Sequence, residues 1–336
     1  MHAIAEPAHA STPKRVLFFG FSITEQPGYV PSLRARLGER DVHVESRAIG
    51  GINLRTLPYL QSLLSYESYD HVVFEVTTCR RYAESDPESY GEVLERVIDQ
   101  VRASGAEPAF VHLFRKGVDY RDDRMLAIAD KLCEARKVPS VNLVPQLVEF
   151  ERTGLLLRYL RDGIHTTAEG ADYYAGALLP FLDALVDDGR APRTGGTADP
   201  DPGFAIVPID RLLPERELSM FKRGNLVMPC VEIPEGESLK LSLPGGCAFD
   251  GLLFLRTPRA GILEVTPAGS GMLQVHAFDQ HSYYRRYATW TSPPGTAAAS
   301  VTIRQLATEP DVTLVKGERD AGPKIGEVCG VLVRTL

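Results

Sequence analysis

Short apolar runs alternate with helical stretches through the first 187 residues, and this alternation constrains the fold more than any other feature of the sequence. The runs that have the character of buried strands are residues 15–20, 42–48, 70–77, 107–114 and 140–143. Amphipathic segments separate them, the clearest being residues 87–103. Strands that alternate with helices predict an α/β fold with a doubly wound parallel sheet.

The character of the sequence changes after residue 189. Residues 190–203 are rich in Pro, Gly and Asp, as is typical of a linker. Short apolar segments then recur between turn signals such as Pro-Gly-Gly, without a helical period. A chain of 336 residues is longer than one hydrophobic core usually serves. We therefore expect an α/β domain at residues 14–189, the linker, and an all-β sandwich of jelly-roll type at 204–336.

Composition excludes several classes of function. The net charge of −7 and the pI near 5.7 argue against a nucleic-acid partner, which needs a basic face. No apolar run reaches the roughly 18 residues of a membrane span, and residues 1–14 lack the apolar core of a signal peptide. The five cysteines are scattered without metal-ligand spacing, which favours reduced thiols. We expect a cytoplasmic protein; the oligomeric state stays open, and a homodimer is compatible with the sequence.

Polar residues and glycines follow three of the predicted strands. Ser22 follows the first, Gly50 and Gly51 the second, and residues 77–79 the third. Ligands of doubly wound sheets bind outside the carboxyl ends of the strands, so these residues are candidates for one site. Further along, Asp162 and His165 precede a helix, which we expect to start with a capping box of Thr166 and Glu169.

These residue types fit nucleophilic catalysis. A serine hydroxyl is a poor nucleophile unless a base lies within hydrogen-bond reach and a third group orients that base. His165 and Asp162 could act as base and orienting group for Ser22, while Gly50 and Gly51 allow backbone N–H groups to approach an oxyanion closely. The alternatives are a strand-end serine in a turn, a histidine packed on a helix start and a solvated aspartate.

Three stretches resemble the sequence blocks of the SGNH (GDSL-type) hydrolase family, over about residues 14–187. They are Gly20-Phe21-Ser22-Ile23-Thr24, Ala48-Ile49-Gly50-Gly51 and Asp162-Gly163-Ile164-His165. The resemblance implies a flavodoxin-like sheet carrying a triad of Ser22, His165 and Asp162. It also implies oxyanion N–H groups from Ser22 and Gly51, with Gly50 as the close alternative, and it requires no metal or organic cofactor.

The sequence departs from the family pattern at two points. Phe21 replaces the usual Asp of the first block, which is not a triad member. Cys79 stands where the third block has an Asn that donates to the oxyanion, and a thiol is a weak donor. Either Thr78 or Arg80 replaces that donor, or the oxyanion hole has fewer donors. Arg80 or Arg81 could instead bind a carboxylate or phosphate of the substrate.

Other candidates are less favoured. Cys79 as a nucleophile paired with His165 is the weaker alternative, because a buried cysteine at a strand end is usually inert. The paired carboxylates Asp122-Asp123 and Asp187-Asp188 are expected to be solvated helix ends, so no metal site is predicted.

The sequence therefore predicts a serine-dependent hydrolase that cleaves an ester of a small molecule or sugar through an acyl-enzyme. One alternative is an acyltransferase that moves the acyl group to a sugar or small-molecule hydroxyl. Another is a binding protein that keeps the fold with a failed site. The acyl group, the alcohol and the role of the C-terminal domain are not encoded in any pattern that we recognise.

Overall fold

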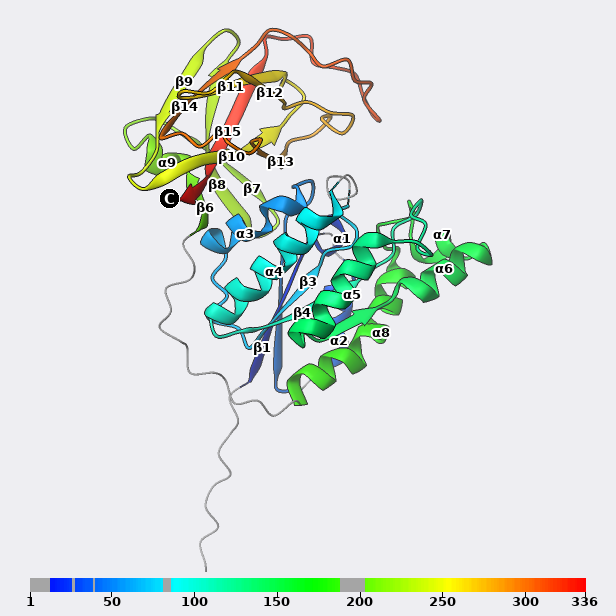
Figure 1. Ribbon diagram of the computed structural model, residues 1–336. Helices are drawn as coiled ribbons and strands as arrows, with labels where there is room; N and C mark the ends of the chain where they lie inside the picture. The colour runs from blue at the N-terminus through cyan, green and yellow to red at the C-terminus, as the bar shows by residue number, and fades with distance from the viewer. Residues whose placement is uncertain (1–12, 26–27, 39, 81–85, 188–202) are drawn as a thin grey trace, which may run out of the picture.

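Two structural units follow each other along the chain, an α/β unit and then a β unit (Figure 1). The computed structural model describes residues 13–25, 28–38, 40–80, 86–187 and 203–336. The expected linker, residues 190–203, lies outside the described residues except for Gly203. In the described part of the chain, no helix combines the length and the apolar character needed to cross a bilayer.

The first unit is built on a five-stranded sheet in which every strand pair is parallel. Its strands are β1 (Lys14–Gly20), β2 (Val42–Ala48), β3 (His71–Glu75), β4 (Glu107–His112) and β5 (Ser140–Asn142). Their order is β2-β1-β3-β4-β5, which is the flavodoxin-like order and confirms the predicted fold class. The loops that follow β1, β2 and β3 therefore meet at one edge of the sheet.

Helices cover both faces of this sheet, which explains why the strands are apolar throughout. One face packs against α2 (Tyr29–Leu37), α6 (Val144–Arg152), α7 (Leu156–Tyr159) and α8 (Ala168–Asp187). The other face packs against η1 (Leu54–Thr56), α3 (Leu57–Leu60), α4 (Pro87–Ala103) and α5 (Arg124–Arg136), with the short η2 (Gln61–Leu63) following α3.

The expected capping box at the start of α8 is wrong by one residue. Thr167, not Thr166, accepts a hydrogen bond from the Gly170 N–H, at 3.0 Å. Glu169 forms an ion pair with Arg158 instead of reaching back to the cap. The Thr167 hydroxyl also donates to the Arg158 carbonyl of α7, at 2.6 Å, and this contact holds Thr167 at the cap.

The second unit is a β-sandwich, as predicted, and all its strand pairs are antiparallel. One sheet has the order β13-β10-β15-β8-β7, with β6 also paired to β15, and the other has the order β12-β11-β14-β9. A single core cluster lies between the two sheets. The elements are β6 (Phe204–Pro208), α9 (Ile209–Leu212), β7 (Ser219–Arg223), β8 (Leu226–Pro234), β9 (Ser238–Ser242), β10 (Cys247–Arg256), β11 (Ile262–Pro267), β12 (Leu273–His276), β13 (Arg286–Thr291), β14 (Ser300–Gln305) and β15 (Ile325–Thr335).

The outer face of the larger sheet packs directly on the α/β unit, next to α3 (Figure 1). Apolar residues of both units share one buried cluster, in which Leu253 and Tyr287 join Ile52 of the first unit. The Asn53 N–H donates to Thr289 Oγ1 at 2.9 Å across this contact. The sandwich therefore lies against the same edge of the parallel sheet at which the candidate residues gather.

Candidate active site

Ser22 is the first residue of α1 (Ser22–Glu25), a single helical turn that follows the end of β1 at Gly20. The N–H groups of Thr24 and Glu25 donate to the Phe21 carbonyl at 3.0 and 2.8 Å, which fixes this turn. The hydroxyl of Ser22 is thereby presented at the carboxyl end of β1, the first strand of the sequence, where we expected it.

His165 lies within hydrogen-bond distance of Ser22, although 143 residues separate them. Its Nε2 is 2.9 Å from Ser22 Oγ, and its Nδ1 is 2.7 Å from Asp162 Oδ2. The other carboxylate oxygen, Asp162 Oδ1, accepts the N–H groups of His165 at 2.8 Å and Ile164 at 3.1 Å. A proton on Nδ1 facing the carboxylate leaves Nε2 free to accept the serine proton.

The electrostatics of this loop keep Asp162 ionised. Partial burial raises the pKa of its carboxyl, but the hydrogen bonds from the His165 ring and backbone outweigh that effect and hold the pKa below its ordinary value. An ionised Asp162 at neutral pH can stabilise a positive charge on the imidazole of His165.

Gly50 and Gly51 form a tight turn against Ser22. A Cβ on Gly50 would lie only 3.2 Å from Ser22 Cβ and 2.5 Å from Glu25 Oε2. Gly51 has a φ of +89°, and a Cβ there would lie 2.6 Å from Arg286 Nη1. Gly51 needs glycine because of its left-handed φ, whereas a side chain at Gly50 would displace the Glu25 carboxylate and press on Ser22.

Comparison with known structures finds the same two-part architecture. A two-domain esterase active on acetylated mannans, crystallised with mannopentaose, matches 96% of this chain and 90% of its own at 15% identity, with a TM-score of 0.62. A second crystal structure of such an esterase matches 96% and 91% of the two chains at 14% identity, with a TM-score of 0.63. A protein from Parabacteroides merdae described as a GDSL-like lipase matches 52% of this chain and 97% of its own, at 15% identity and a TM-score of 0.44.

The first unit has the SGNH-hydrolase fold, with the β-sandwich as an additional domain. At identities this low, the likeness establishes the fold alone. No family model matches the sequence, and a comparison with curated proteins found no match.

The segment that resembles the third block, residues 77–80, makes hydrogen bonds to other parts of the α/β unit. Thr78 donates its N–H and its hydroxyl to the carboxylate of Glu75, at 2.9 and 3.0 Å. The Cys79 thiol donates to the Ile52 carbonyl at 3.1 Å. Arg80 is only 4% exposed. Its guanidinium makes two hydrogen bonds to Asp123, at 2.7 and 2.6 Å, so this arginine is engaged within the fold. Arg81 lies outside the described residues.

The expectation that Asp123 is a solvated helix end is therefore wrong. Asp123 is 9% exposed and caps α5, accepting the N–H groups of Met125 and Leu126 at 3.1 and 3.3 Å. Burial raises the pKa of its carboxyl, but Arg80 and the capping N–H groups lower it further, to below its usual range. Of the other predicted helix end, Asp187 is exposed and Asp188 lies outside the described residues.

The buried pair of Arg80 and Asp123 predicts a large loss of stability when one charge is removed. We expect Asp123→Asn to lower the free energy of unfolding by about 3–5 kcal/mol, because asparagine keeps the helix cap but leaves the guanidinium without its counter-ion. Asp86→Asn is the matched control, since Asp86 caps α4 but pairs with Arg55 near the surface, and it should cost less than about 1 kcal/mol. Chemical denaturation measures both free energies of unfolding, and equal losses in Asp123→Asn and Asp86→Asn would contradict the prediction.

Glu75 is a site residue that the sequence reasoning missed. It is 1% exposed at the end of β3 and accepts backbone N–H groups of Phe21 and Thr77 besides the two bonds from Thr78. One carboxylate thus joins the loop that carries Ser22 to the loop that follows β3. The sequence signal that could have revealed Glu75 is an acidic residue inside the apolar run 72–76.

Burial raises the pKa of Glu75 to about 7, against the lowering effect of its hydrogen bonds. The folded protein then keeps a proton between about pH 4.5 and 7 that the unfolded chain has lost, so folding stability falls as the pH rises through this window. The shift corresponds to roughly 3 kcal/mol. We expect Glu75→Gln to remove this part of the pH dependence, measured as the free energy of unfolding at both ends of the window. The same pH dependence in variant and wild type would contradict it.

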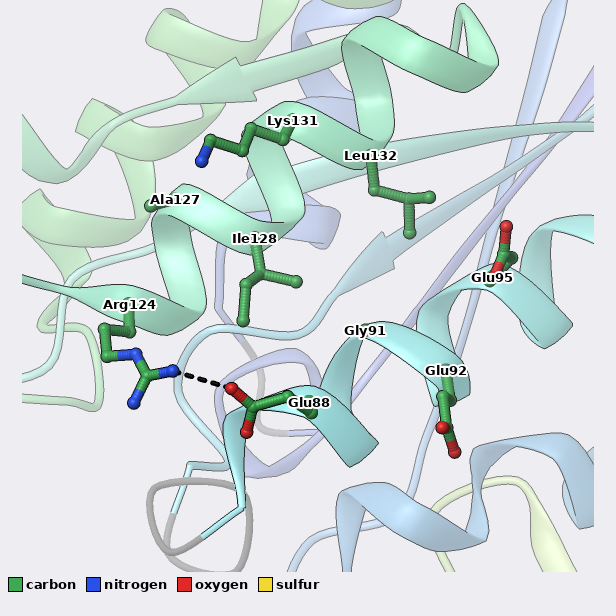
Figure 2. Close-up of a pocket in the computed structure, with 9 residues that line it drawn as sticks. All are labelled: Glu88, Gly91, Glu92, Glu95, Arg124, Ala127, Ile128, Lys131 and Leu132. Atoms are coloured by element: carbon green, nitrogen blue, oxygen red, sulfur yellow. Dashed lines mark hydrogen bonds and ion pairs between the residues drawn. The ribbon is translucent and has the colours of Figure 1, made fainter.

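A groove that lies away from the candidate site runs between α4 and α5 (Figure 2). It has a volume of about 520 Å³ and an apolar floor that includes Ile128 and Leu132. Glu88 and Arg124 form an ion pair of 2.6 Å at one end. None of the residues of the candidate site lines this groove, so the groove is separate from that site.

Proposed function

We propose that this protein is a serine-dependent ester hydrolase that works through an acyl-enzyme on Ser22. The observation that carries the proposal is the chain of hydrogen bonds from Ser22 Oγ to His165 Nε2, at 2.9 Å, and from His165 Nδ1 to Asp162 Oδ2, at 2.7 Å. This arrangement has the three members that nucleophilic catalysis by serine needs. The esterase of similar architecture acts on acetylated mannans, which makes acetylated carbohydrates the first substrate class to test.

The proposed reaction has two halves. Ser22 Oγ attacks the ester carbonyl while His165 Nε2 takes the hydroxyl proton, and Asp162 stabilises the resulting imidazolium. His165 then gives the proton to the departing alcohol, which leaves the acyl group on Ser22. A water molecule attacks the acyl-enzyme with His165 again as base, and this step releases the acid and restores the serine.

The proposed oxyanion hole consists of the Ser22 N–H and an N–H of the Gly50–Gly51 turn. Gly50 packs directly against Ser22, which favours this pair of donors. The proposed oxyanion hole does not include Thr78, Cys79 or Arg80, since each of them makes hydrogen bonds to other groups. One missing donor costs about 3–4 kcal/mol of transition-state stabilisation, so we expect a slow enzyme.

A fluorophosphonate probe tests the proposal directly. We expect the folded wild-type protein to be labelled once, with the adduct on the peptide that contains Ser22, and we expect His165→Ala to abolish labelling. A folded wild-type protein that resists the probe would support the alternative of a binding protein with a failed site. An adduct on Cys79 would support the thiol as nucleophile.

Hydrolysis is favoured over acyl transfer because the side chains of His165 and Asp162 are 21% and 49% exposed, which leaves water access to the base. A transferase needs a site that excludes water. Incubating the enzyme with an acetyl ester, with and without a sugar alcohol as acceptor, separates the two reactions. Exclusive release of free acid would eliminate the acyltransferase, and acylated sugar would eliminate simple hydrolysis.

A further inference from the structure

The turn between β7 and β8 of the sandwich contacts both loops of the proposed site. Arg223 donates from Nε and Nη2 to the two carboxylate oxygens of Glu25, at 2.7 and 2.8 Å. Asn225, two residues later, donates from Nδ2 to the Ser46 carbonyl at 2.8 Å. Gly224 lies between them, close to the Ala48 carbonyl. One hairpin therefore bridges α1 and the end of β2.

The contact of Arg223 with Glu25 leads to the reacting groups. Glu25 is the last residue of the helical turn that Ser22 begins, and its side chain is 8% exposed. Its carboxylate lies against Gly50, with Oε2 only 2.5 Å from the position that a Cβ would occupy there. Gly50 in turn packs on Ser22. The contacts thus form a continuous path from Arg223 to the nucleophile and to the oxyanion turn.

A second arginine of the sandwich covers the other side of the same turn. Arg286, at the start of β13, is 4% exposed and pairs with Asp279. Its Nη1 lies against Gly51, 2.6 Å from the position of a Cβ. The Gly50–Gly51 turn is therefore enclosed between Glu25, which Arg223 binds, and Arg286.

We propose that Arg223 is a positioning residue of the hydrolase site, which through Glu25 fixes the Ser22 turn against the Gly50–Gly51 turn. The inference rests on the proposed function, because only in an ester hydrolase do the enclosed N–H groups serve as oxyanion donors. A bidentate arginine–carboxylate pair fixes direction as well as distance, and a lysine cannot reproduce it. Oxyanion donors stabilise the transition state only when they are precisely placed before the reaction. The sandwich is then a structural part of the site.

The first test is kinetic. We expect Arg223→Met to lower kcat for an acetyl ester roughly 10- to 100-fold, the size of effect that a displacement near 1 Å produces, with KM within about twofold. Arg223→Lys should recover only part of the rate. Glu25→Gln should resemble Arg223→Met, and the double variant should lose no more than either single variant, because both remove one interaction. Lys222→Ala, at the exposed neighbouring position on β7, is the control and should match wild type.

The second test does not depend on catalysis. Hydrogen exchange followed by mass spectrometry should show faster exchange in the peptide containing residues 46–53 of Arg223→Met, and no change in Lys222→Ala. Wild-type kcat and wild-type exchange in Arg223→Met would overturn the inference and leave the proposed function intact. Faster exchange with lower kcat and unchanged KM supports it. A wild-type protein that neither hydrolyses esters nor reacts with the fluorophosphonate would refute the proposed function, and the inference with it.

Discussion

Replacing Ser22 with alanine is expected to lower kcat for ester hydrolysis by about 10⁴-fold or more, because the acyl-enzyme can no longer form. KM should change little, since the hydroxyl group that is removed contributes little to binding the ester. Initial rates with a chromogenic acetyl ester, at enzyme concentrations high enough to measure residual turnover, give the comparison.

The control for Ser22→Ala is a comparison with the His165→Ala variant and with the double variant, because the triad residues act together. His165→Ala should cause a loss of similar size, and the Ser22→Ala/His165→Ala double variant should lose no more than the single ones. Thermal unfolding should be close to wild type in Ser22→Ala, which removes one oxygen atom at the end of β1. Retention of more than about a tenth of the wild-type kcat in Ser22→Ala would refute the proposed nucleophile.

Replacing Asp162 with asparagine is expected to lower kcat by roughly 10³- to 10⁴-fold. Asparagine can keep the bonds that Asp162 Oδ1 accepts from the N–H groups of Ile164 and His165, so the turn should survive. Its amide group, placed where Oδ2 now faces Nδ1, would donate to the ring and put the proton on Nε2. The imidazole could then no longer accept the Ser22 proton. Steady-state kinetics and thermal unfolding of the same preparation measure both effects.

Asp119→Asn is a matched control for this substitution. Asp119 also accepts a backbone N–H two residues later, from Arg121 at 3.1 Å, and it is 63% exposed. Its kcat should equal that of the wild-type enzyme. If Asp162→Asn kept most of its activity while remaining folded, the carboxylate would have no part in orienting the base.

The two substitutions test different parts of the proposed mechanism. Ser22→Ala tests whether the serine forms a covalent intermediate, whereas Asp162→Asn tests whether the histidine must carry its proton on Nδ1. If Ser22→Ala were inactive and Asp162→Asn active, the protein would be a serine hydrolase whose histidine is oriented by another group, such as the backbone of its own loop.

The arrangement of the α/β unit was accessible from the sequence because its signals are local. Short, mostly apolar runs such as residues 15–20 and 107–114 are typical of strands buried on both faces, and the helical segments between them favour a parallel sheet. The spacing of Asp162 and His165 is also a local signal. A carboxylate three residues before a histidine can bind both the backbone and the ring of that residue, as it does here.

The sequence determined the parallel sheet, the β-sandwich and the residue types at the carboxyl ends of the parallel strands, while the tertiary structure decided what those residues contact. Nothing local to Arg80 indicated Asp123, and nothing local to Glu25 indicated Arg223, which lies 198 residues away. Periodicity and turn chemistry act over a few residues, so they fix elements and caps. Contacts between distant charged groups form only when packing has brought their elements together, and burial then selects the partner, because an unpaired charge inside the protein is too costly.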